Sequence, residues 1–86
     1  MVFRLTEHAK ERAVERGTTQ EEIQKVLTKG KETKAKEGRR GKEMVFEYRK
    51  DWLGKTYPQK KGKGIYIEED NENIVITVKV YYGKWR

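Results

Sequence analysis

The sequence contains no cysteine, one histidine and one proline in 86 residues. Without cysteine, neither a disulfide framework nor a thiolate metal site can form, and a single histidine excludes a cage of several histidines. No apolar run approaches the ~18 residues of a membrane span, and the N-terminus lacks the ~7–15-residue apolar segment of a secretory signal. We therefore expect a cytoplasmic protein without membrane contact, metal or other cofactor, which folds by packing alone.

Positive charge is in excess, with 21 Lys and Arg against 14 Asp and Glu, a formal net charge of +7. Such a balance favours polyanionic partners such as nucleic acid. Charged residues make up 41% of the chain and are mostly Lys and Glu, a composition also found in heat-adapted proteins with surface ion-pair networks. Both interpretations are open, although residues 39–42 and 60–63 are basic clusters without an acid in segments that resemble loops.

The N-terminal third has the signals of two helices. Thr6 is a suitable N-cap for a helix over about residues 7–16, and Gly17 supplies the left-handed ending that helices favour. The spacing of Thr19 and Glu22 is that of a capping box. It predicts a second helix over about residues 20–29 that ends at Gly30 and packs on the core through three residues, Ile23, Val26 and Leu27.

Beyond residue 31 the apolar residues alternate with period two, which predicts strands over about 43–50, 63–69 and 73–82. A frayed edge strand around 33–36 is a further option. The residues expected to face the helices are Met44, Phe46, Tyr48, Ile65, Ile67, Ile74, Ile76, Val78 and Val80. We thus predict one α+β domain over 1–86, with two N-terminal helices packed on one face of a three- to four-stranded antiparallel sheet.

The opposite face of the predicted sheet is mixed in character, with Val45, Glu47, Arg49, Tyr66, Thr77, Lys79 and Tyr81. Antiparallel sheets often leave one face in contact with solvent. Aromatic rings interleaved with cations also stack unpaired bases and neutralise phosphates, as in recognition of single-stranded RNA. The C-terminal Trp85 fits that surface as well, although an aromatic plug at one end of the core is the simpler interpretation.

The only histidine belongs to a ladder with two arginines. His8, Arg12 and Arg16 are four residues apart, so a helix places them on one strip of surface. Metal-independent RNA cleavage needs an acid or base and cations for the phosphate, which His8 and the two arginines would supply. The alternative is structural, because all three side chains can form hydrogen bonds or ion pairs that fix the helix on the sheet.

Other basic and aromatic residues complete the candidate nucleic-acid surface. Their proximity to the ladder depends on the fold and does not follow from spacing. These candidates are Arg39, Arg40, Lys42, Tyr57, Lys60, Lys61, Lys63, Lys79, Tyr81 and Tyr82. The acidic run Glu68-Glu69-Asp70 is read as a solvated hairpin and not as a metal site, because neighbours in a strand point apart.

Several of these residues carry a resemblance to a known family. The pattern H-A-x-x-R-x-x-x-R-G over 8–17, followed by Thr19, Glu22-Ile23, Val26-Leu27 and Val75-Ile76-Thr77-Val78, resembles the domains of unknown function numbered 4258, which are similar to the RelE and BrnT toxins. Some members share Trp52-x-Gly54, Tyr57, Lys60-Lys61 and Tyr82-Gly83-x-Trp85. Thr18 departs from the aliphatic residue usual after Arg-Gly, which puts one packing contact in doubt.

The resemblance implies a toxin-like fold, two helices on an antiparallel sheet, in which related proteins often cleave RNA without a metal. Fold does not determine activity. Two functions follow as expectations. The first is a metal-independent endoribonuclease that acts on single-stranded RNA and is held in check by an acidic antitoxin protein. The second is a non-catalytic RNA- or protein-binding module of the same fold.

Overall fold

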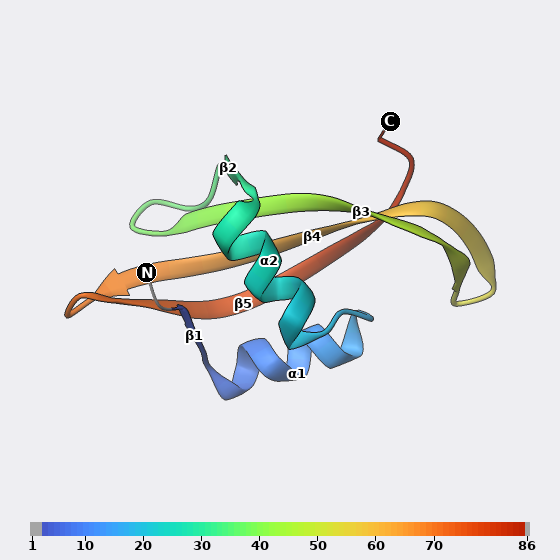
Figure 1. Ribbon diagram of the computed structural model, residues 1–86. Coiled ribbons are helices and arrows are strands. Elements are labelled where there is room, and N and C mark those ends of the chain that lie inside the picture. Colours follow the sequence, from blue (N-terminus) through green and yellow to red (C-terminus); the bar gives the residue numbers. More distant parts are fainter. Residues whose placement is uncertain (1–2, 86) are drawn as a thin grey trace.

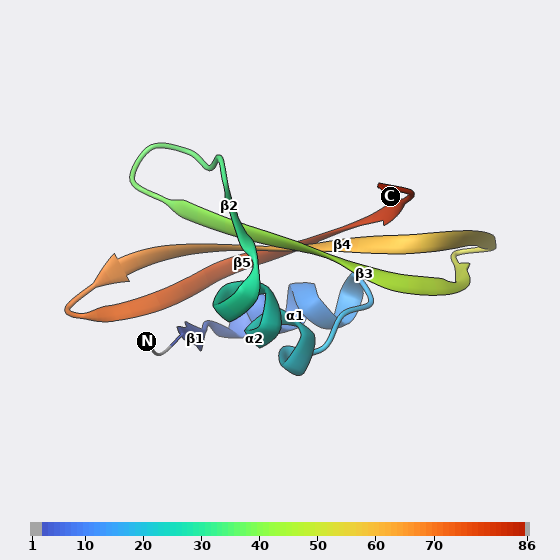
Figure 2. The same ribbon diagram turned by 45° about the horizontal axis from the view of Figure 1, so that its top comes forward.

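The computed structural model describes residues 3–85 as five strands and two helices on one twisted sheet. In chain order the elements are β1 (Phe3–Leu5), α1 (Glu7–Glu15), α2 (Gln20–Lys29), β2 (Lys31–Thr33), β3 (Arg40–Trp52), β4 (Lys55–Glu69) and β5 (Glu72–Gly83). The strands lie in the order β1-β5-β4-β3-β2. Both helices cover the same face, whereas the segment between β2 and β3 rises on the other side (Figures 1 and 2).

The predicted antiparallel sheet of three or four strands is wrong. The sheet has five strands and is mixed, because β1 precedes the helices and pairs with β5 in parallel. Strands hold more than half of the described residues. Strand β1 escaped detection because three residues are too few to show alternation. Its residues Phe3 and Leu5 are buried by contacts with residues far away in the sequence. One of these contacts is the edge-on packing of the Phe3 ring against Tyr66.

The hairpin of β3 and β4 extends much further than the sequence indicated. Its two-residue turn, Leu53 and Gly54, is left-handed at both positions, with φ of 50° and 84°, the geometry that matches strand twist. The segment 55–63 that follows is polar and contains Pro58, and proline is rarely found inside a strand because it lacks an N–H group. Pro58 lies opposite the bulge formed by Tyr48 and Arg49, where the ladder of hydrogen bonds is interrupted and a missing N–H is tolerated.

The helix caps are as predicted. The hydroxyl of Thr6 accepts from the N–H of Ala9, and that of Thr19 accepts from the N–H of Glu22, each at 3.1 Å. Gly17 has a φ of +82° just beyond α1. Neither helix of the described residues 3–85 is long and apolar enough to cross a membrane.

The core lies between the helices and strands β4 and β5. Its fully buried residues are Ala9, Ala13, Ile23, Val26, Leu27, Val75 and Val78. Glycine in the middle of β4 allows α2 to approach the sheet closely, since a Cβ at Gly64 would lie 3.0 Å from Cδ2 of Leu27. The two glycines of β4, Gly62 and Gly64, therefore face the apolar stripe of α2.

A bulge between β4 and β5 overturns part of the predicted face assignment. The register shifts between Ile65 and Tyr66, so Val75 pairs with Tyr66 and Thr77 pairs with Ile65. Along β4 the helix-facing positions are Gly62, Gly64 and Tyr66, so Tyr66 is buried in the core beneath the helices, contrary to the prediction. Ile65 lines a hollow on the opposite face with Thr77. In β5 the extra residue is Ile76, and it shifts the alternation so that Val75 and Val78 are both buried against the helices.

Candidate nucleic-acid interface

A basic hollow of about 250 Å³ lies on the sheet face opposite the helices. We call it the basic hollow. Its lining consists of Lys34, Ala35, Lys36, Arg39, Lys63, Ile65, Thr77 and Lys79. Five of these eight side chains are cationic and none is acidic, which makes the hollow a strong local concentration of positive charge.

Two structural elements bring these cations together. Lys63 of β4 and Lys79 of β5 are directly opposite each other in the sheet register. The other three cations belong to the segment between β2 and β3, which passes over this face (Figure 2). Lys63 connects the two elements, because its ammonium donates to the carbonyl oxygen of Lys34 at 3.1 Å.

The positive charges of the basic hollow are not neutralised by ion pairs. Within the described residues, none of its five cations lies within 4.0 Å of a carboxylate oxygen. Glu43 is in register with Lys63, whose charge helps to lower the pKa of Glu43, but the direct ion pair of this carboxylate is with Lys61 at 3.3 Å. Like charges placed opposite each other in a sheet are destabilising, so this arrangement favours a bound anion.

Aromatic side chains continue the same face beyond the basic hollow. Tyr81 is 46% exposed and Trp85 is 38% exposed. Lys61, in register with Tyr81, places its ammonium 4.9 Å from the ring centre of Trp85. The backbone N–H of Trp85 donates to Oε1 of Gln59 at 2.7 Å. Trp85 therefore lies over the open face and does not close the core, contrary to the simpler expectation.

Only the last member of the helical ladder borders this surface. Arg16 reaches the free edge of β5, where its guanidinium donates to the carbonyl oxygen of Val78 at 2.5 Å. There it lines a hollow of about 240 Å³ with Lys79, Val80 and Tyr81. Arg12 instead pairs with Glu15 at 2.5 Å. His8 is exposed, and its side chain has no hydrogen bond or ion pair within residues 3–85.

Three of the predicted nucleic-acid residues belong to a cluster on the helix side, in which Lys60 is buried and the aromatic rings are half-buried. The ammonium of Lys60 contacts Glu22, and the hydroxyl of Tyr82 donates to the carbonyl oxygen of Arg16 at 2.6 Å. Trp52 stacks on Tyr82 with ring centres 4.8 Å apart, and the ring centre of Tyr57 lies 5.6 Å from that of Tyr82. Burial, with the nearby Tyr48 and Glu22, raises the pKa of Tyr82 to about 12. These groups hold the structure together and do not line the basic hollow.

The remaining basic candidates are partly engaged elsewhere. Arg40 pairs with Glu32 at 2.8 Å and with Glu68 at 3.6 Å. The hydrogen bond that Arg40 donates to Glu32 is the main reason that the pKa of Arg40 is raised. Lys42 is half-buried and in register with Glu32. Of the predicted set, the structure therefore brings Arg39, Lys63 and Lys79 into the basic hollow and places Lys61 and Tyr81 beside it.

Sequence reasoning missed Lys34 and Lys36, which complete the basic hollow. They were assigned to a frayed edge strand, but β2 ends at Thr33 and both lysines belong to the following loop. The available signal was the segment 34–42, which holds five basic residues and a single acid, Glu37. No group of three or more His, Asp or Glu residues in the described chain could hold a metal ion.

These features define a class: a small basic α+β domain with two helices on one face of a mixed sheet and uncompensated cations on the other. The family model described as domain of unknown function DUF4258 matches residues 5–82. The chain belongs to this family. No curated protein and no solved structure matches the chain. The match confirms the family resemblance, whereas the likeness to RelE and BrnT toxins stays a prediction.

Proposed function

We propose that this domain binds single-stranded RNA through the sheet face that carries the basic hollow. The observation that supports the proposal is five cations around about 250 Å³ with no acid in the lining. A phosphate group in the hollow would replace repulsion among the cations by attraction. Phosphate contacts of this kind supply most of the affinity of proteins for nucleic acids.

The neighbouring aromatic residues favour a single strand over a duplex. Tyr81 and Trp85 are exposed on the same face as the hollow, and their rings can stack only on bases that are not paired. Arg16 continues the cationic surface around the edge of β5, where it borders Tyr81. A strand bound in this way would place phosphates at the hollow and bases over the aromatic residues.

The geometry supports binding more strongly than cleavage. Catalysis on the ladder would need His8, Arg12 and Arg16 to converge on one phosphate. Arg12 pairs with Glu15 and Arg16 holds the edge of β5, so both guanidinium groups already have protein partners. Among the possible polyanionic ligands, RNA is favoured by the resemblance of this domain to toxins that act on RNA. A partner of the antitoxin class would be acidic and would compete with RNA for this face.

Fluorescence anisotropy with a 5′-labelled 12-nucleotide oligo(U) tests the proposal. We expect log Kobs to fall linearly with log salt, with a slope of about −0.7 per phosphate contacted. The variant Lys34→Gln/Lys36→Gln should bind about tenfold more weakly and with a shallower slope, because it removes two of the cations of the hollow. Lys10→Gln/Lys55→Gln loses the same charge elsewhere and should change affinity by about twofold or less.

Equal weakening by the two double variants would mean attraction by net charge alone and would overturn a site at the hollow. Absence of binding at low salt would overturn RNA binding altogether. The same RNA incubated with excess chelator should stay intact. Cleavage by the wild type that is lost in His8→Ala would instead establish the endoribonuclease.

A further inference from the structure

The outer edge of β3 is unpaired over much of its length. Strand β2 pairs only with Gly41, Lys42 and Glu43. From Met44 onward, no strand in the described chain lies beside this edge. Such an edge presents alternating N–H and C=O groups, which form a template for another extended chain.

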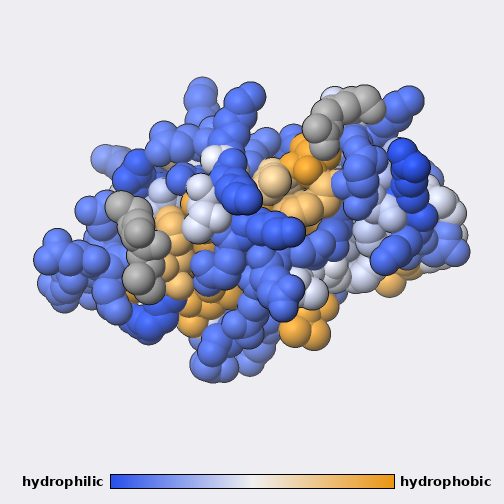
Figure 3. Space-filling view, in the orientation of Figure 1, coloured by the Kyte–Doolittle hydropathy of each residue, from blue (hydrophilic) through white to orange (hydrophobic). Residues whose placement is uncertain are grey.

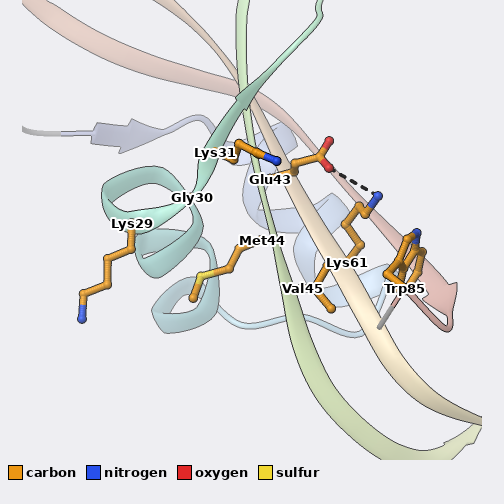
Figure 4. A pocket seen from close by; sticks show the side chains of 8 residues that line it. All are labelled: Lys29, Gly30, Lys31, Glu43, Met44, Val45, Lys61 and Trp85. Carbon is orange, nitrogen blue, oxygen red and sulfur yellow. Dashed lines mark ion pairs between the residues drawn. The ribbon is translucent and has the colours of Figure 1, made fainter.

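A groove runs along this edge, between the C-terminal end of α2 and β3. Its volume is about 490 Å³. We call it the edge groove. It is lined by Lys29, Gly30, Lys31, Glu43, Met44, Val45, Lys61 and Trp85, with Lys29 and Lys31 on either side of Gly30 and an ion pair joining Lys61 and Glu43 (Figure 4).

The edge groove combines an apolar floor with a basic border. Met44 and Val45 are half-buried, and an apolar area surrounded by hydrophilic side chains opens between α2 and the C-terminal segment (Figure 3). Met44 points to the helix side of the sheet and Val45 to the opposite side. An extended chain that pairs with β3 would therefore direct one alternating set of side chains toward each of them. Glycine at position 30 allows the end of α2 to lie close to β3. A Cβ added there would be only 2.7 Å from the carbonyl oxygen of Glu43.

Charge decides which extended chain fits. Three lysines and one glutamate line the edge groove, a net charge of +2. Lys29 and Lys31 are exposed, and neither forms an ion pair within residues 3–85. Edge-to-edge pairing of two copies of this chain would bring these like charges together, whereas an acidic segment would neutralise them.

We propose that the edge groove binds an extended acidic segment of a partner protein, which adds a strand to β3. Backbone hydrogen bonds to β3 provide the register, and carboxylates of the segment meet Lys29 and Lys31. Its apolar side chains, which all point to one face of the sheet, rest on Met44. This inference does not rest on RNA binding. The edge groove shares Lys61 and Trp85 with the proposed RNA surface, but the five cations of the basic hollow are other residues.

A synthetic peptide serves as the probe: N-acetylated, fluorescein-labelled (Glu-Val)₄. We expect it to bind and to slow hydrogen exchange of the backbone amides in the range 44–47. The same peptide with every second backbone nitrogen methylated keeps its charge but loses the donors along one edge, so its affinity should fall at least about tenfold. The (Lys-Val)₄ peptide should not bind.

Variants separate the edge groove from the RNA face. Lys29→Gln/Lys31→Gln should weaken the acidic peptide about fivefold and leave oligo(U) affinity within about twofold. Lys34→Gln/Lys36→Gln should do the reverse. Failure of the acidic peptide to bind, equal affinity for its methylated form, or binding without protection of residues 44–47 would each overturn strand addition. Strand addition at this groove would also be overturned if Lys10→Gln/Lys55→Gln weakened peptide binding as much as Lys29→Gln/Lys31→Gln, because the peptide would then be attracted by the net charge of the protein alone.

Discussion

The ammonium nitrogen of Lys60 lies 2.8 Å from Oε1 of Glu22 and thereby joins strand β4 to helix α2. The same nitrogen donates to the carbonyl oxygen of Gly17 at 3.0 Å and lies 5.3 Å from the ring centre of Tyr48. Several positions of the family resemblance, among them Gly17, Lys60 and Tyr82, thus meet in one partly buried cluster. Their shared pattern reflects the architecture of the domain.

The first prediction concerns the stability that this ion pair provides. Lys60→Met should lower the free energy of unfolding by about 2–4 kcal/mol, because it leaves the carboxylate of Glu22 partly buried without its cation. Urea denaturation followed by circular dichroism measures the change. The neighbouring variant Lys61→Met breaks an ion pair on the open face and should lower stability by about 1 kcal/mol or less. Equal losses would contradict a special role for Lys60.

The second prediction concerns acid sensitivity. Burial works against ionisation of Glu22, but hydrogen bonds from Lys60 and Thr18 outweigh it, and its pKa is lowered from the ordinary value of 4.5. A lowered pKa in the folded state contributes stability above the ordinary value, and that contribution is lost as pH falls through the folded-state pKa. Unfolding free energies of wild type and Glu22→Gln should therefore differ most near neutral pH and converge below pH 4.5. A constant difference would show that Glu22 is not the titrating group.

The third prediction tests the close approach at Gly17. Its φ of +82° is strained for any side chain, and an added Cβ would lie 2.5 Å from the hydroxyl oxygen of Tyr82 and 2.6 Å from the ring of Trp52. Gly17→Ala should therefore lower the unfolding free energy by about 3 kcal/mol or more. Gly38 has a similar φ of +80° with open space around it, so Gly38→Ala measures backbone strain alone, about 1 kcal/mol. Similar losses at both sites would rule out the steric argument.

The fourth prediction concerns stacking on the open face. Tyr81→Ala should weaken oligo(U) binding by about fivefold or more while the salt dependence stays the same, because it removes a stacking surface and no charge. Anisotropy titrations at several salt concentrations measure both quantities. Leu53→Ala, at an 88% exposed apolar residue in the distal turn, is the matched control and should have no effect. A change in slope with Tyr81→Ala would indicate that the ring acts through neighbouring phosphate contacts.

The expected strand 63–69 illustrates why the sheet was harder to predict than the helices. A helix is stabilised by residues three and four apart, so Thr6, Thr19 and Gly17 are sufficient signals for where helices begin and end. The strand's partners are distant in sequence, and the bulge beside Tyr66 depends on its pairing with β5. No local pattern shows which alternating set of β4 faces the helices, and the set that does is Gly62, Gly64 and Tyr66. In β5 the bulge at Ile76 moves Val75 to that side.

The sequence alone determined the two helices, the excess of positive charge and the absence of cysteine chemistry. These are properties of composition and of neighbours along the chain. Only the tertiary structure decided that Lys60 and Tyr82 serve the interior while Lys34, Lys36 and Lys79 gather in one hollow. The physical reason is that the roles of these side chains depend on burial and on partners tens of residues away, which the twist, register and bulges of the sheet bring together.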